Sequence, residues 1–78
     1  MMNSEVPIYQ ALYMCYSRNA ILRCVAWKGD FFEFEWVFCM SGWKACQDRE
    51  GEVESIHKDN LAPLHEINEM EVIAYASR

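Results

Sequence analysis

Cysteine and histidine are the residue types in this chain that could act as nucleophiles or hold a metal. The set is Cys15, Cys24, Cys39, Cys46, His57 and His65. No Cys-x-x-Cys pair occurs and neither histidine stands at ligand spacing, so the pattern does not predict a metal site. Most of the cysteines lie among apolar residues, which predicts reduced thiols packed in a core. A nucleophilic pair of Cys46 and His57 would require two neighbouring strands, and a packed thiol is the simpler interpretation.

Carboxylates offer a second kind of chemistry. Glu33 and Glu35 share one side of an extended segment, about 7 Å apart, which would suit acid–base catalysis. A solvated face explains the pair more simply. The chain also lacks a Gly-x-Ser-x-Gly motif and a phosphate-binding glycine loop, and it contains only 3 glycines. We therefore expect a protein that is not an enzyme and uses no cofactor.

The formal net charge is −5, and the acidic residues gather in the second half of the chain. Negative charge repels phosphate backbones, so we expect no direct binding of nucleic acid. The acidic surface either keeps a small domain soluble or meets a basic partner. Both interpretations stay open.

Length and composition place the chain in a simple class. Its 78 residues make one domain, and 3 Trp, 4 Tyr and 4 Phe supply much of the material for a core. No apolar stretch is long enough to cross a membrane. The start, Met-Met-Asn-Ser-Glu, does not resemble a signal peptide, which predicts a cytoplasmic protein.

The element that must position everything else is residues 31–38, Phe-Phe-Glu-Phe-Glu-Trp-Val-Phe. In a strand, side chains alternate between two sides, so four rings share one side. Those rings are Phe32, Phe34, Trp36 and Phe38. The pattern predicts a central antiparallel strand whose aromatic side is buried.

The neighbouring segments predict a small β protein. Residues 21–27 should form a hairpin with residues 31–38 through Lys28-Gly29-Asp30, with short strands at 43–47 and 53–57 and a 3₁₀ turn at 58–61. Residues 8–16 fit a helix or a strand equally well. In residues 64–78 the apolar side chains fit the spacing of a helix as well as that of a strand. We favour a final strand at 71–75. The fold class is therefore mainly β, a small antiparallel barrel of five or six strands.

Four short motifs resemble those of SH3 domains, in that family's order. Ala11-Leu12-Tyr13 with Tyr16 is similar to the opening Ala-Leu-Tyr-Asp-Tyr, and Lys28-Gly29-Asp30-Phe31 to the Lys-x-Gly-Asp turn. Gly42-Trp43-Lys44-Ala45 resembles Gly-x-Trp-Trp-x-Ala, and Asn60-Leu61 resembles the closing Pro-x-Asn-Tyr-Val. The resemblance covers residues 9 to about 64. It implies a single SH3-like domain over 1–78, with a C-terminal extension from about residue 65.

The resemblance also implies where a partner would bind. SH3 domains hold polyproline segments on an aromatic shelf. The positions expected to form such a surface are Tyr13, Tyr16, Trp43 and Leu61, with Glu52 and Glu54 in an acidic rim. We therefore expect a protein-binding module. The alternative is a small acidic inhibitor from a phage or mobile element that blocks a nucleic-acid-processing enzyme, with charge at Glu52, Glu54, Glu69 and Glu71. An exposed edge strand could also pair two copies into a homodimer.

Overall fold

The structure is a computed structural model that describes residues 6–40 and 44–76. Its strands are β1 (Leu12–Cys15), β2 (Ala20–Lys28), β3 (Phe31–Cys39), β4 (Val53–His57) and β5 (Leu64–Ile67). Its helices are α1 (Lys44–Gln47), the single 3₁₀ turn η1 (Lys58–Asn60) and α2 (Glu69–Ala76). Among the described residues, no helix combines the length and apolar character that a bilayer crossing requires.

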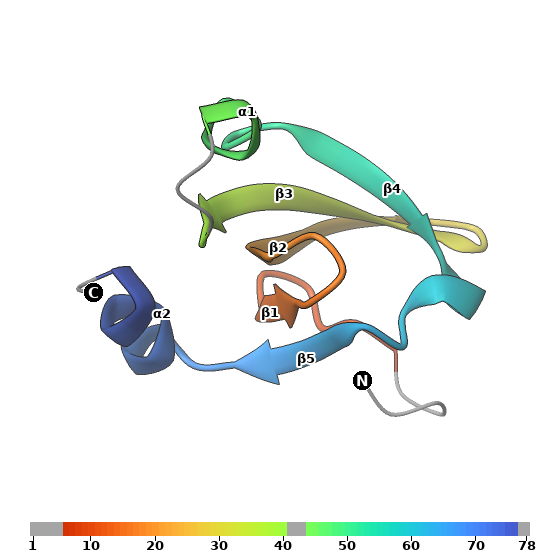
Figure 1. The fold of residues 1–78 in the computed structure, drawn as a ribbon. Helices are drawn as coiled ribbons and strands as arrows, with labels where there is room; N and C mark the ends of the chain where they lie inside the picture. The colour runs from red at the N-terminus through yellow and green to blue at the C-terminus, as the bar shows by residue number, and fades with distance from the viewer. Residues whose placement is uncertain (1–5, 41–43, 77–78) are drawn as a thin grey trace.

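The five strands form one antiparallel sheet in the order β4-β3-β2-β1-β5. The sheet curls, and the chain passes from edge strand β4 through η1 to the opposite edge strand β5 (Figure 1). This confirms the predicted fold class, with its antiparallel strands and 3₁₀ turn near residues 58–61. Within the described part of the chain no ladder joins β4 to β5, so the curled sheet is not a closed barrel.

The hairpin β2–β3 is the longest part of the sheet and contains its central strand, β2. Lys28 pairs with Phe31, so Gly29 and Asp30 alone make the turn. Gly29 has φ 62°, a conformation that side chains disfavour. The predicted hairpin is thus confirmed. A cross-strand ion pair joins Lys28 Nζ and Glu33 Oε1, at 3.5 Å.

Alternation along β3 holds for three of the four predicted rings. Phe32, Phe34 and Trp36 are buried in one cluster. A bulge then interrupts the ladder, because Ile21 pairs with Phe38 but Leu22 pairs with Trp36, which leaves Val37 as an extra residue. The extra residue shifts the alternation by one, so Phe38 packs in a different cluster from the other rings. The prediction of one row of four rings is wrong at this position.

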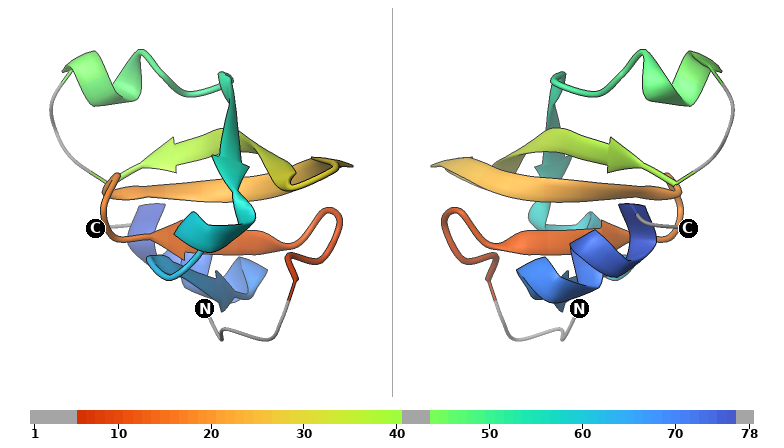
Figure 2. Two further views of the ribbon diagram at one scale, coloured as in Figure 1. Left: turned by 90° about the vertical axis from the view of Figure 1, so that its right-hand side faces the viewer. Right: turned by 90° about the vertical axis from the view of Figure 1, so that its left-hand side faces the viewer.

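Two apolar clusters lie on the two sides of the sheet. The first cluster contains eleven buried residues, among them Tyr13, Phe34 and Leu64. The second cluster contains three, Leu12, Met14 and Ile21, and Val72 of α2 packs against it. Figure 2 shows α2 beside β1 and β5, whereas α1 lies at the other edge of the sheet. The first cluster is therefore enclosed by the curled sheet, and the second is covered by half-buried side chains.

The predicted strand at 43–47 is wrong, because Lys44–Gln47 is the helical turn α1. The backbone beside Trp36 is occupied by later residues: Gly51 N donates to the Trp36 carbonyl at 2.7 Å, and Trp36 N donates to the Glu52 carbonyl at 2.8 Å. Residues 44–47 therefore have no strand to pair with and satisfy their backbone groups locally, as in the bond from Asp48 N to the Lys44 carbonyl.

The predicted strand at 71–75 is also wrong. The final strand comes earlier, where β5 pairs with β1 so that Cys15 faces Leu64 and Leu12 faces Ile67. The helix α2 follows at once. Asn68 begins it, because its side-chain oxygen accepts a hydrogen bond from Glu71 N at 2.9 Å.

The cysteines divide into two kinds. Cys15 and Cys24 are free and buried, as predicted, and burial raises the pKa of the Cys24 thiol. Cys39 and Cys46 instead form a disulfide, with their Cα atoms 5.9 Å apart. The prediction of reduced thiols is wrong for this pair, because α1 brings Cys46 against the end of β3.

Candidate protein-binding surface

The structure separates the residues predicted to bind a partner. Tyr13 is only 1% exposed, and its ring meets the Phe34 ring edge-on at 5.9 Å. Its hydroxyl oxygen accepts a hydrogen bond from Ile8 N at 2.7 Å. Leu61 is buried in the same cluster. The expectation that these two side chains face a partner is therefore wrong, because both point into the space that the curled sheet encloses.

The other two apolar positions give a mixed outcome. Tyr16 is 64% exposed, just after β1, and its ring packs against the His65 ring at 5.1 Å. It could meet a partner, but it stands apart from the other exposed aromatics. Trp43 lies outside the described residues.

The predicted acidic rim is neutralised by two arginines. Arg18 Nε donates to Glu54 Oε1 at 2.9 Å, and Trp36 Nε1 donates to the same oxygen at 3.2 Å. The hydrogen bond from Arg18 holds the pKa of the Glu54 carboxyl below its usual range, although burial opposes this shift. Nε of Arg49 lies 3.1 Å from Oε1 of Glu52. The Arg49 guanidinium stacks over the Trp36 ring, with Cζ 4.0 Å from the ring centroid. Glu52 and Glu54 are thus part of an internal charge network.

A different set of apolar residues is exposed together. Trp27 is 71% exposed, Tyr9 69% and Val6 67%. With their neighbours they form a pocket of about 200 Å³, which we call the aromatic pocket. It is lined by Val6, Pro7, Tyr9, Cys24, Ala26, Trp27 and Phe32.

A second bulge places Trp27 in the aromatic pocket. Cys24 pairs with Phe34 but Ala26 pairs with Glu33, so Val25 is an extra residue in β2. Trp27 consequently faces Phe32 across the ladder, and the two rings stack with centroids 6.2 Å apart. Trp27 Nε1 donates to the Gly29 carbonyl, which fixes the indole over the turn. Opposed residues point to the same side of a sheet, so the bulge brings Trp27 to the side of Phe32.

The opposite wall of the aromatic pocket is the segment before β1. Pro7 is buried, and the backbone of the segment is tied to the sheet at two points. Gln10 N donates to the Cys24 carbonyl at 2.7 Å, and Cys24 N donates to the Ala11 carbonyl at 3.1 Å. A pocket of this size is smaller than a typical small-molecule site and suits one apolar side chain.

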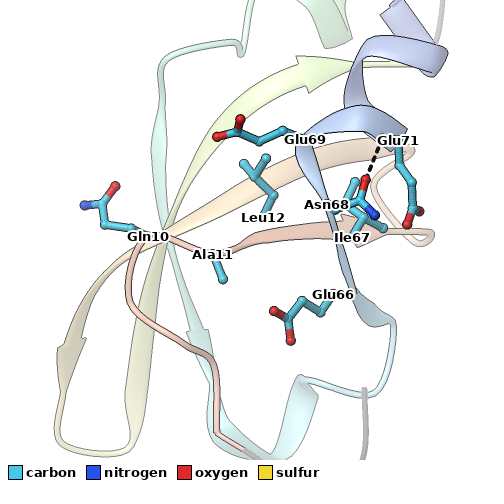
Figure 3. Close-up of a pocket in the computed structure, with 8 residues that line it drawn as sticks. All are labelled: Gln10, Ala11, Leu12, Glu66, Ile67, Asn68, Glu69 and Glu71. Atoms are coloured by element: carbon cyan, nitrogen blue, oxygen red, sulfur yellow. Dashed lines mark hydrogen bonds between the residues drawn. The ribbon is translucent and has the colours of Figure 1, made fainter.

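The residues that follow this part of the chain, Gln10 to Leu12, border an acidic groove. The groove has a volume of about 550 Å³ and is lined by Gln10, Ala11, Leu12, Glu66, Ile67, Asn68, Glu69 and Glu71. Figure 3 shows Glu66 and Glu69 on either side of the Ala11–Leu12 backbone, whereas Glu71 lies beyond Ile67. Consecutive parts of residues 6–12 thus line the two hollows: Val6, Pro7 and Tyr9 line the aromatic pocket, and Gln10, Ala11 and Leu12 line the acidic groove.

Within residues 6–40 and 44–76, no ion pair joins a basic side chain to the carboxylates of the acidic groove. Among the described residues, every lysine and arginine except Arg23 lies within 4.0 Å of an acidic side chain outside the groove. Arg23 instead reaches Gln10, with Nη1 3.4 Å from Oε1, at the margin of the groove. Glu69 and Glu71 also stand in the first turn of α2, where the helix dipole favours negative charge.

The nucleophilic pair considered from the sequence does not form. Cys46 is bonded to Cys39, and Nδ1 of His57 accepts a hydrogen bond from Asp59 N at 3.1 Å. Within the part of the chain that the structure describes, no group of three His, Cys, Asp or Glu side chains could hold a metal ion.

Sequence reasoning missed the residues of the aromatic pocket. Tyr9 belongs to residues 8–16, for which the sequence left helix and strand open. Trp27 had a visible signal, because a large ring beside a tight turn is hard to bury completely.

Comparison of the chain with protein-family models, curated proteins and solved structures finds no match. The geometry of the chain itself therefore has to support any functional conclusion.

Proposed function

We propose that this protein is a non-enzymatic module that binds another protein through the aromatic pocket, with the acidic groove beside it. The observation that carries the proposal is the exposure of Trp27 and Tyr9 around a small apolar pocket. Tryptophan and tyrosine are the residues that most often anchor protein interfaces. Trp27 is also held rigidly by its stacking on Phe32 and its bond to Gly29, so little conformational entropy is lost on binding.

The partner segment in this proposal carries one apolar side chain flanked by lysine or arginine. The apolar side chain enters the aromatic pocket, and the basic side chains reach the carboxylates of Glu66 and Glu69. Such charges speed encounter and select among partners more than they add affinity. We place the interaction in the cytoplasm, as the sequence predicts.

Membership of the SH3 class remains part of the proposal. It is supported by the five-stranded order and by the 3₁₀ turn between β4 and β5. An aromatic surface that binds polyproline has less support, since Tyr13 and Leu61, two of its expected residues, are buried. The proposed site is therefore the aromatic pocket, together with the acidic groove lined by the adjoining residues Gln10 to Leu12.

The test is selection of peptides from a random displayed library on the purified protein, followed by calorimetry with the selected sequences. We expect Trp27→Ala to weaken binding by tenfold or more, in the range seen for anchoring aromatics. Tyr16→Ala removes a similarly exposed ring that does not line the aromatic pocket, and it serves as the matched control. Selected peptides that bind Trp27→Ala as tightly as the parent protein would exclude the aromatic pocket.

The second candidate function is the acidic inhibitor of a nucleic-acid-processing enzyme. The observation that favours it is the set of groove carboxylates that form no ion pair with any basic side chain the structure describes. Changing Glu66, Glu69 and Glu71 together to glutamine should then abolish binding that is steeply salt-dependent, while Trp27→Ala leaves it intact. Asp48→Asn, at a carboxylate already paired with Lys44, is the control.

A further inference from the structure

The disulfide joins two parts of the chain that few other contacts hold together. Cys39 ends β3, and Cys46 belongs to α1, whose main neighbour is β3. Cys46 packs against the first cluster, whereas Lys44 and Gln47 face outward. A helix of four residues has almost no stability of its own. The position of α1 therefore depends on the sulfur–sulfur bond.

The residues that follow α1 are anchored independently. A carboxylate oxygen of Glu50 accepts a hydrogen bond from Cys39 N at 2.8 Å, and Gly51 N donates to the Trp36 carbonyl at 2.7 Å. Arg49 stacks over the Trp36 ring. Loss of the disulfide would consequently free residues 44–48 and leave the sheet and residues 49–52 in place.

The two bonded cysteines differ in exposure, which decides where an external thiol attacks. Cys46 is only partly buried, whereas Cys39 is 3% exposed, and the free thiols of Cys15 and Cys24 are buried. An external thiol therefore meets Cys46 first. The bond closes a loop with a sequence separation of only 7, so the two thiols stay close after reduction and re-form the bond readily.

We infer that Cys39 and Cys46 form a redox-sensitive clamp that releases α1 when a small thiol such as glutathione reduces it. The glutathione thiolate attacks Sγ of Cys46, the sulfur–sulfur bond breaks, and its electron pair leaves on Sγ of Cys39, which takes up a proton. A second glutathione thiolate then attacks the sulfur of the bound glutathione, the mixed disulfide breaks, and its electron pair leaves on Sγ of Cys46, which takes up a proton. Two glutathione molecules are thus oxidised to one disulfide, and the protein disulfide is reduced to two thiols.

The proposal fits the occurrence of disulfides in thiol-rich compartments. Such bonds are uncommon there and, when present, usually form and break as part of redox sensing or catalysis. The clamp is independent of the aromatic pocket, since neither Cys39 nor Cys46 lines it. A failure of the clamp would leave the proposed function untouched.

The experiment is limited trypsin digestion of the full chain equilibrated in glutathione buffers of varied ratio, with the bonded fraction measured by alkylation and intact mass. The side chain of Lys44 is 88% exposed, so cleavage after it reports the local opening of α1. We expect reduction to speed this cleavage by roughly tenfold or more, because proteolysis follows the population of the open form. When the protein with an intact Cys39–Cys46 disulfide is cleaved after Lys44, the disulfide should hold the two fragments together until it is reduced.

Two serine variants complete the test. Cys46→Ser should be cut at the fast rate in both oxidising and reducing buffers, while Cys24→Ser, at a buried thiol outside the clamp, should keep the redox dependence. Hydrogen exchange at the Asp48 amide, which bonds to the Lys44 carbonyl, gives a second readout in the unmodified chain. Equal cleavage rates in the two redox states, or four alkylated cysteines in the native protein under oxidising conditions, would overturn the clamp.

Discussion

The two sides of the sheet show how differently one set of strands can be buried. The first cluster is closed by the curl of the sheet and contains eleven buried residues. The second cluster contains three and depends on half-buried neighbours, including Val72 from the eight-residue helix α2. Because burial of apolar area is the main stabilising term, most of the stability should reside in the first cluster. The second cluster can then loosen without unfolding the sheet.

The largest expected effect is in the first cluster. Phe34 is 0% exposed and packs against Tyr13, so Phe34→Ala should lower the free energy of unfolding by about 3–5 kcal/mol, measured by chemical denaturation. Phe38→Ala, on the same strand but half-buried in the second cluster, is the matched control and should lose less than half as much. Equal losses would remove the distinction between the clusters.

A smaller effect is expected where α2 covers the second cluster. Val72→Ala should lower the free energy of unfolding by about 1 kcal/mol, because a partly buried side chain loses two methyl groups. Amide exchange should rise in α2 and stay unchanged in β2 and β3. Ile73→Ala removes an exposed side chain from the same helix and should change neither quantity. Faster exchange throughout the sheet would show that the two clusters unfold as one unit.

The smallest effect concerns the charge network at the edge of the first cluster. The folded-state pKa of Glu54 is depressed, so its contribution to stability is present above the ordinary glutamate pKa and is lost as the pH falls through the lower folded value. Because both side chains of the Arg18–Glu54 pair are about one-quarter exposed, we expect a loss of at most about 1 kcal/mol. Glu54→Gln should remove this part of the acid dependence, whereas Glu35→Gln should not. Denaturation curves between pH 3 and 6, the range around the ordinary glutamate value of about 4.3, would show this.

Much of the fold could be read from local signals. Alternation from Phe31 to Trp36 predicts a strand with a buried aromatic side, and Gly29 predicts the turn, because both depend only on backbone geometry at those residues. The candidate site could not be read in the same way. Its walls, Tyr9 and Trp27, are separated in the sequence and become neighbours only when residues 6–11 bond to β2.

The sequence by itself determined the β2–β3 hairpin, the strand β4 and the acidic character, because side-chain period, glycine conformation and charge are local properties. The tertiary structure alone decided which side of the sheet Trp27 and Phe38 occupy, since each follows a one-residue bulge at Val25 or Val37. A bulge is set by the partner strand, and moving the register by one residue reverses the side chains that follow. The Cys39–Cys46 bond likewise required α1 to form where no strand partner was left.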